Sequence, residues 1–258
     1  HGWQPVVLIV AFAVALILPI AFLFLPERPA SIGLTLYGEP ADAALTIVEA
    51  RKNPIKTAFS ALGKAMKVRD FWLLFFSFFI CGASTNGYIG THFIAMCHDY
   101  GLDAVKGAGI LAAMGALDLV GTTTSGCLSD RYNNRILLFW YYGLRGLALL
   151  FLPYAFGLTY FGLPIFALFY GLDWIATVPP TVRLTNDVFG TQDAPIIFGW
   201  VVAGHQLGAA FAALLAGILR STLGTYTVAT MISGGLCVIA AVLVLNINKR
   251  KAYPLASA

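Results

Sequence analysis

The chain alternates between long apolar blocks and short polar stretches. Seven apolar blocks, each long enough to cross a bilayer, lie near residues 5–25, 71–96, 107–128, 136–156, 160–182, 195–219 and 227–247. A helix of about 20 residues rises about 1.5 Å per residue and crosses a hydrocarbon core of about 30 Å. A transmembrane barrel would instead show alternating segments of about 10 residues, which the sequence lacks. The pattern therefore predicts an all-α integral membrane protein with seven spans.

Composition supports a membrane protein over a soluble one. Of the 258 residues, 59% are apolar and only 11% are charged, whereas a soluble domain carries about 25% charged residues. The net charge of +4 is not arranged as a basic stripe with aromatics, so we expect no nucleic-acid partner. The four cysteines lack CxxC or Cys/His metal spacing, so we expect no disulfide framework, no metal and no cofactor. Walker, GxGxxG, GxSxG and HExxH motifs are also missing, and we expect no enzyme activity.

Lysine and arginine lie mainly on one side of the predicted membrane. That side carries 13 of the 16 basic residues, which are Arg28, Arg51, Lys52, Lys56, Lys64, Lys67, Arg69, Arg131, Arg135, Arg183, Lys249, Arg250 and Lys251. The opposite side carries Lys106 and Arg220 alone. Because cytoplasmic loops are enriched in Lys and Arg, we expect segment 26–70 and the C-terminus to be cytoplasmic and His1 to lie outside.

The long connection 26–70 contains a candidate amphipathic helix. From Pro54 to Val68, the apolar residues Ile55, Phe59, Leu62 and Met66 share one side, and Lys56, Lys64 and Lys67 lie elsewhere. Such a helix would lie on the inner leaflet and be attracted by anionic lipid. The alternative is a solvated linker with some helix.

A motif follows the third predicted span. The sequence from Gly126 to Arg135 reads GCLSDRYNNR, and it resembles the G-x-L-[SA]-D-R-x-x-x-R signature of the major facilitator superfamily. Gly126 would permit close helix approach at the membrane edge. Asp130 would offer a carboxylate to a neighbouring helix N-terminus, and Arg131 and Arg135 would be cytoplasmic anchors of a gating loop.

The resemblance implies an organisation for the whole chain. In this superfamily the motif recurs after the second and eighth of twelve helices. Residues 1–25 would then be helix 6, 26–70 the cytoplasmic central loop, 71–247 the C-terminal six-helix bundle (helices 7–12), and 248–258 a cytoplasmic tail. The chain starts at His1 without a Met or a basic leader region, so we expect a truncated start, with the N-terminal half as a missing partner.

A second resemblance narrows the family. Leu25 to Leu34 reads LPERPASIGL, followed by Tyr37-Gly38-Glu39. This segment is similar to the one after helix 6 in bacterial monocarboxylate-type and oxalate–formate-antiporter-like members.

Ionisable residues inside the predicted spans mark candidate functional sites, because they are costly in a bilayer. Asp118 lies ten residues from Leu128, and Arg145 lies nine residues from Ile136. At about 1.5 Å per residue, both lie about 14–15 Å from the inner boundary. We therefore predict an Asp118–Arg145 ion pair. The resemblance places Arg145 on a peripheral helix, where it would satisfy Asp118 from behind; the alternative is binding of a substrate carboxylate.

Asp173 and His205 are expected at a common depth. Asp173 lies ten residues from Arg183, and His205 lies ten residues beyond Pro195. The resemblance implies that helices 7, 8, 10 and 11 line a central cavity, which makes Asp118, Asp173, His205 and the adjacent Gln206 cavity residues. Their functional interpretation is substrate binding or proton coupling. The alternative is interhelical hydrogen bonding, which the neighbouring Gly204 and Gly208 favour for His205.

The second span carries Asn86 among glycines and small polar residues, which favours a bendable segment facing the cavity. Asn86 would hydrogen-bond a solute, or would instead serve helix packing. Pro179 and Pro180 remove backbone donors and predict a kink in the fifth span.

The resemblance implies that the chain is a fragment of a secondary active transporter for small organic solutes, such as monocarboxylates. It would work by alternating access in the plasma membrane of the cell, with lipid and protons as further partners. Two alternatives stay open, namely a polyspecific exporter of cations, which Asp118 and Asp173 would serve, and a receptor or assembly subunit that transports nothing.

Overall fold

The computed structural model describes residues 4–26, 32–33, 53–158 and 161–247. The chain divides into two compact units, His1–Asn53 and Pro54–Ala258. The first unit contains α1 (Gln4–Phe24), a 21-residue apolar helix none of whose residues is buried within the chain. Most of the predicted loop 26–70 and the whole predicted tail lie outside the described residues.

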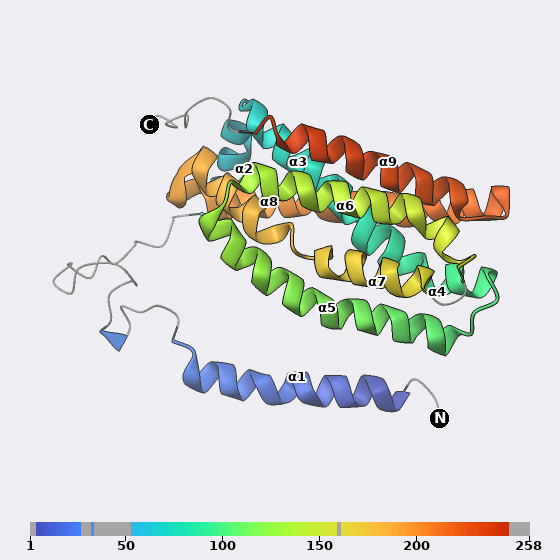
Figure 1. Ribbon diagram of the computed structural model, residues 1–258. Coiled ribbons are helices and arrows are strands. Elements are labelled where there is room, and N and C mark those ends of the chain that lie inside the picture. Colours follow the sequence, from blue (N-terminus) through green and yellow to red (C-terminus); the bar gives the residue numbers. More distant parts are fainter. Residues whose placement is uncertain (1–3, 27–31, 34–52, 159–160, 248–258) are drawn as a thin grey trace. The chain divides into compact units, whose positions relative to one another are not determined.

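The second unit is built from helices, and its described residues contain no strand (Figure 1). They are α2 (Pro54–Ala65), α3 (Arg69–Gly82), η2 (Ala83–Ile89), α4 (Gly90–Asp99), α5 (Ala104–Arg131), α6 (Asn134–Ala155), α7 (Gly162–Asp173), α8 (Val178–Leu223) and α9 (Thr227–Val244). The expected all-α fold is confirmed. The amphipathic segment predicted at 54–68 forms α2.

Among the residues that the structure describes, six helical segments are long and apolar enough to cross a membrane, against seven predicted. The difference lies in one segment of 62 residues, Gly162–Leu223, which contains the fifth and sixth predicted spans. Inside α8 the backbone leaves the helical region at Gly190 alone, where φ is 75° and ψ is 159°. Glycine adopts this positive φ without a steric penalty. The sequence predicts a polar connection at 183–194, and the structure is helical there on both sides of a break at Gly190.

Close backbone contacts hold these helices together. A Cβ added to Gly121 of α5 would lie 1.8 Å from the carbonyl oxygen of Leu172 in α7, and one added to Gly208 of α8 would lie 2.0 Å from that of Phe79 in α3. A Cβ on Gly146 of α6 would lie 2.9 Å from the carbonyl oxygen of Gly234 in α9. Small residues permit such approaches between membrane helices. Helices α6 and α9 accordingly lie side by side, as do α5 and α7 (Figure 1).

The segment from Arg69 to Asp99 is continuously helical, through α3, η2 and α4. Its middle seven residues, Ala83–Ile89, form the π-helix η2. A π-turn inserts an extra residue into the helix and is often found at functional sites. The segment predicted to bend around Asn86 therefore departs from α-helical geometry.

Candidate functional site

A polar cavity of about 250 Å³ lies within the second unit. It collects three residues singled out in the sequence, Asn86 from η2 and His205 and Gln206 from α8. The full lining is Phe78, Cys81, Thr85, Asn86, Trp174, Ile175, Thr177, Val178, Phe198, Val202, His205 and Gln206. Amide, imidazole, hydroxyl and thiol groups thus share one space with three aromatic rings.

The π-helix, the end of α3 and α8 each line part of this cavity. In η2 the hydroxyl groups of Ser84 and Thr85 donate to the carbonyl oxygen of Cys81, at 3.1 and 2.7 Å. A Cβ on Gly82 would lie 1.9 Å from the carbonyl oxygen of His205, so the two backbones are in direct contact. The rings of Phe78 and His205 lie 5.0 Å apart. The ring of Phe78 thus packs against the His205 imidazole within the cavity lining.

The turn of residues 174–177, which joins α7 to α8, also lines the cavity. The prediction of a kink at Pro179 and Pro180 is refined here, because α7 ends at Asp173 and the two prolines lie in the first turn of α8. A proline in the first turn loses no intrahelical hydrogen bond, since that N–H has no partner in the helix. The break therefore precedes the prolines, and it exposes unpaired backbone groups to the helices behind.

Arg145 supports this turn from behind. Its guanidinium is fully buried, and its Nε donates to the Asp173 carboxylate at 2.7 Å. Nη2 donates to the carbonyl oxygens of Asp173 and Trp174, at 2.5 and 3.2 Å. Nη1 donates to the Cys81 sulfur at 3.0 Å. A buried charge is tolerated only with such pairing, because its desolvation is otherwise too costly.

The predicted ion pair between Asp118 and Arg145 is wrong, because Arg145 pairs with Asp173 instead. Asp118 Oδ1 accepts from the Ile175 backbone N–H at 2.8 Å and from the Thr122 hydroxyl at 2.9 Å. The reason is packing, since α5 lies mainly against α7, whereas α6 lies against α9 and α7. Equal depth in the membrane did not fix which way each side chain points. Neither Asp118, Arg145 nor Asp173 lines the cavity.

The motif loop connects helix ends on one side of the unit. Asp130 forms an ion pair with Arg183 at 2.6 Å, and Arg135 Nη1 donates to the Ile247 carbonyl oxygen at 3.3 Å. Asp130 thus reaches the first half of α8, near the helix N-terminus that we expected. Arg131 is exposed. The close approach expected at Gly126 is wrong for the described residues, which bring nothing within 4 Å of a Cβ placed there.

This loop and the helices around it bear directly on the family. A model of the Major Facilitator Superfamily matches residues 1–184, well over half of the chain. The chain belongs to the Major Facilitator Superfamily. With its membrane-spanning helices, it is a multi-pass membrane protein.

Similar proteins include named superfamily transporters. The chain is 30% identical over 173 residues to Monocarboxylate transporter 12-B of Danio rerio, covering 64% of this chain and 35% of that protein. It is 26% identical over 189 residues to the Uncharacterized MFS-type transporter YcxA of Bacillus subtilis (strain 168), and the match covers 67% of this chain and 45% of that protein. It is 32% identical over 142 residues to Monocarboxylate transporter 12 of Xenopus laevis, and the match covers 52% of this chain and 30% of that protein. The matches span less than half the length of each relative.

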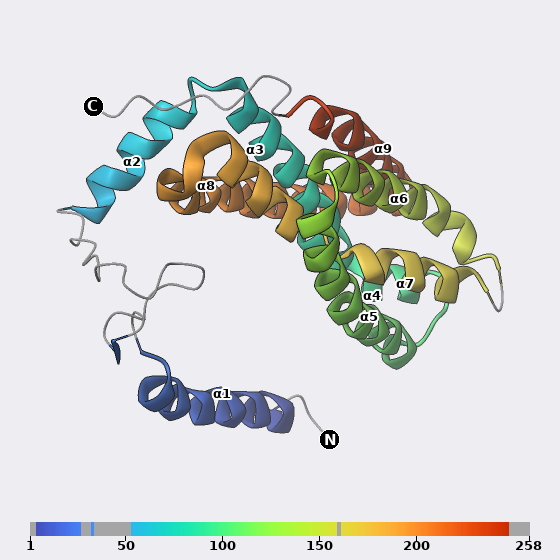
Figure 2. The same ribbon diagram turned by 60° about the vertical axis from the view of Figure 1, so that its left-hand side comes forward.

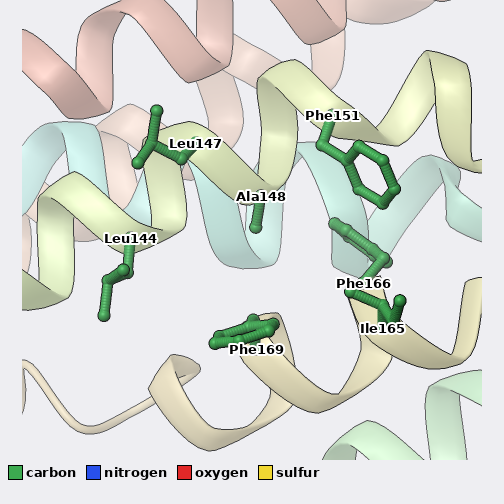
Figure 3. A pocket seen from close by; sticks show the side chains of 7 residues that line it. All are labelled: Leu144, Leu147, Ala148, Phe151, Ile165, Phe166 and Phe169. Carbon is green, nitrogen blue, oxygen red and sulfur yellow. The ribbon is translucent and has the colours of Figure 1, made fainter. Parts of the chain in front are cut away.

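A second cavity of this superfamily chain, about 390 Å³, lies between α6 and α7. Figure 3 shows its seven lining residues, all of them apolar, namely Leu144, Leu147, Ala148, Phe151, Ile165, Phe166 and Phe169. Leu147 and Phe169 are 60% and 51% exposed. Without a polar group this cavity has nothing to recognise a charged solute, and we assign it to the hydrocarbon of the membrane.

Sequence reasoning missed a cluster at the end of the unit opposite the motif loop. Asp99 of α4 forms a bidentate ion pair with Arg220 of α8, at 2.5 and 2.8 Å. The Arg220 guanidinium lies 5.9 Å from the Tyr226 ring centroid, and the Tyr226 hydroxyl lies 3.1 Å from His92 Nδ1. These residues are far apart in sequence and have no common spacing. The cluster joins α4, α8 and the start of α9.

Proposed function

We propose that this protein is a secondary transporter of small monocarboxylates that works by alternating access. The observation that carries the proposal is the polar cavity, which gathers Asn86, His205 and Gln206 beside aromatic rings. The names of two similar proteins, both monocarboxylate transporters, support the same substrate class.

The cavity offers two kinds of recognition. Imidazole and amide N–H groups of His205, Gln206 and Asn86 are donors suited to a carboxylate. Phe78, Trp174 and Phe198 are apolar surfaces suited to a short hydrocarbon substituent. Cavities that orient a small ligand combine a few polar groups with apolar walls in this way.

The cation-exporter alternative receives less support. It requires an acidic side chain facing the solute, yet Asp173 is paired with Arg145 and Asp118 is bonded to the Ile175 N–H. Neither carboxylate lines the polar cavity. A receptor would bind the solute without moving it across the membrane, and the uptake experiment below separates it from a transporter.

Proton coupling is part of the proposal, with Asp173 as the proton carrier. Asp173 is buried, and its Oδ1 atom has no hydrogen-bond partner among the described residues. Such an acceptor can take up a proton, and a neutral carboxyl is cheaper to bury than a charged one. Arg145 donates hydrogen bonds to Asp173, to Cys81 and to the 174–177 turn. A protonation change at Asp173 would therefore alter the hydrogen bonds that Arg145 makes to the cavity wall.

We further propose that α1 corresponds to helix 6 and the second unit to helices 7–12, with the motif loop cytoplasmic. Support comes from Asp130, Arg183 and Arg135, which lie at one end of the unit together with the end of α9. Substrate contacts from helices outside this chain would complete the cavity, as twelve-helix transporters bind at the interface of their two halves.

The test is uptake of labelled monocarboxylates into proteoliposomes that contain the intact protein. We expect saturable uptake that His205→Asn lowers at least tenfold in kcat/KM, with His98→Asn as the matched control, because His98 is exposed and lies outside the cavity. Binding of monocarboxylate without uptake would support the receptor. Saturable export of cationic dyes, with no carboxylate uptake, would support the exporter.

The proton-coupling part has a separate test. In Asp173→Asn the position can no longer lose a proton, so we expect solute exchange to continue while accumulation driven by a pH gradient is lost. Full pH-driven accumulation in Asp173→Asn would assign the proton to another residue.

A further inference from the structure

Helix α2 and the turn of residues 66–68 that follows it present three distinct faces. Successive residues are rotated by about 100° around the axis. Ala61 and Ala65 face the bundle and are 7% and 0% exposed. About 120° around the helix lies an exposed apolar stripe, Ile55, Phe59 and Met66, whose exposed fractions are 70%, 61% and 46%. About 100° further round lies a basic face of Lys56, Lys64 and Lys67, all exposed.

Two indole groups fix α2 against the bundle. Trp200 of α8 donates from Nε1 to the Ala58 carbonyl oxygen at 3.0 Å, and Trp72 of α3 donates to the Met66 carbonyl oxygen at 2.9 Å. The Phe59 and Trp200 rings lie 5.3 Å apart. Figure 2 shows α2 beside α8 and leading into α3. Tryptophan is enriched where membrane proteins meet the headgroups, so this pinning indicates the depth of the interface.

The apolar stripe continues onto a membrane-spanning helix. Trp72, which holds Met66, stacks on Phe76 at 5.7 Å, and Phe76 is 49% exposed on α3. An exposed aromatic ring on a spanning helix is favourably placed against lipid hydrocarbon. The stripe of α2 therefore lies at the edge of the same apolar surface, and this position favours insertion into lipid over capture of a soluble protein.

Charge along this segment is of one sign. From Asn53 to Arg69 there is no aspartate or glutamate, while Lys56, Lys64, Lys67 and Arg69 are basic. A helix with an apolar face in the acyl boundary and a basic face toward the headgroups has the geometry of an interfacial helix. Anionic headgroups attract each basic residue near the surface.

We infer that α2, together with the turn that follows it, is a binding site for anionic phospholipid. Ile55, Phe59 and Met66 insert among the acyl chains, and Lys56, Lys64 and Lys67 bind the phosphates. The inference requires no particular solute and does not depend on transport. Its failure and the failure of the proposed transport function are therefore separate outcomes.

The experiment is hydrogen–deuterium exchange of the peptide covering Pro54–Ala65, with the chain in nanodiscs. One set contains phosphatidylcholine alone, and the other contains phosphatidylcholine mixed with phosphatidylglycerol. We expect slower exchange in the anionic discs, because exchange reports the open fraction of a local segment. Each lysine should contribute up to about fivefold to this difference. At about 1 M salt, where the screening length falls to about 3 Å, the difference should largely vanish.

Three variants separate the two faces. Lys56→Gln combined with Lys64→Gln and Lys67→Gln should abolish the difference between lipids, while Lys106→Gln, exposed at the start of α5, should leave it unchanged. Ile55→Asn should speed exchange in both lipids. Equal exchange of the unmodified helix in neutral and anionic discs would overturn the inference and leave the basic face to an acidic protein. An unchanged rate in Ile55→Asn would show that the stripe is not inserted, which overturns it as well.

Discussion

Arg145 places a permanent positive charge in the interior of the second unit, and each of its three guanidinium nitrogens donates a hydrogen bond. The guanidinium is fully buried, and it binds one carboxylate oxygen, one sulfur and two backbone carbonyl oxygens. Removing one member of such a pair leaves the other charge without compensation, which typically costs about 3–5 kcal/mol.

Asp173→Leu should therefore lower the free energy of unfolding by several kcal/mol, measured as thermal unfolding in detergent. Adding Arg145→Met should recover much of the loss, because no unpaired charge remains. The matched control is Arg131→Gln, a change at an exposed arginine, which should have little effect. A double variant as unstable as the single one would contradict the assigned pairing.

Asp118 gives a second prediction at the residue scale. Its Oδ1 accepts the Ile175 N–H, so Asp118→Leu should leave that N–H unpaired and disturb the cavity wall. An unsatisfied buried donor costs about 1–3 kcal/mol. We expect a raised KM for monocarboxylate uptake in Asp118→Leu, and a KM near the original in Asp118→Asn, which keeps the acceptor oxygen. Loss of binding in Asp118→Asn would instead indicate that the negative charge is required.

Helix packing depends on glycines that the sequence does not distinguish from one another. Along α5, a Cβ added to Gly121 would collide with the Leu172 carbonyl oxygen, whereas one added to Gly115 would meet none of the described residues within 4 Å. Gly121→Ala should force α5 and α7 apart and destabilise the protein by about 1–3 kcal/mol. Gly115→Ala, on the same helix, should be neutral or stabilising by up to about 1 kcal/mol, because alanine favours helix. Thermal unfolding of both variants in one detergent compares them, and equal losses would contradict the contact.

The spans were predictable because hydropathy is a property of each local segment. Which helices pack together depends on contacts between segments far apart in the sequence, and it was not predictable in this way. The apolar blocks correspond to the observed helices, and the amphipathic pattern found α2. The predicted connection between the fifth and sixth spans, residues 183–194, contains the break at Gly190, but its polar residues did not show that the helix continues on both sides of that glycine. Asn86, His205 and Gln206 were singled out by polarity in apolar surroundings, and they share a cavity. The partner of Arg145 was missed because neighbours in sequence, α5 and α6, are not the closest neighbours in space.

At the scale of the whole molecule, the two ends of the second unit are closed by different contacts. One end has the Asp130–Arg183 pair, and the other has the Asp99–Arg220 pair. Exposed pairs contribute at most about 1 kcal/mol each, so they are suited to reversible contacts. We propose, from the count of basic residues, that the end with Asp130 is cytoplasmic.

That orientation is testable by cysteine labelling. In a Cys127→Ala background, which removes the exposed native cysteine, Lys106→Cys should react with an impermeant maleimide added to intact cells. Arg131→Cys should react only after the cells are permeabilised. The reverse pattern would invert the proposed topology.

The supports of the 174–177 turn have a consequence for how related chains diversify. Arg145 binds the carbonyl oxygens of Asp173 and Trp174, Asp118 binds the N–H of Ile175, and the Ser125 hydroxyl donates to the carbonyl oxygen of Ala176 at 2.5 Å. All of these acceptors and donors in the turn belong to the main chain, which every amino acid carries. Side chains such as Ile175 and Val178 can therefore be exchanged without loss of their scaffold. Under the proposed function, substrate range can evolve at the lining while the architecture behind it stays the same.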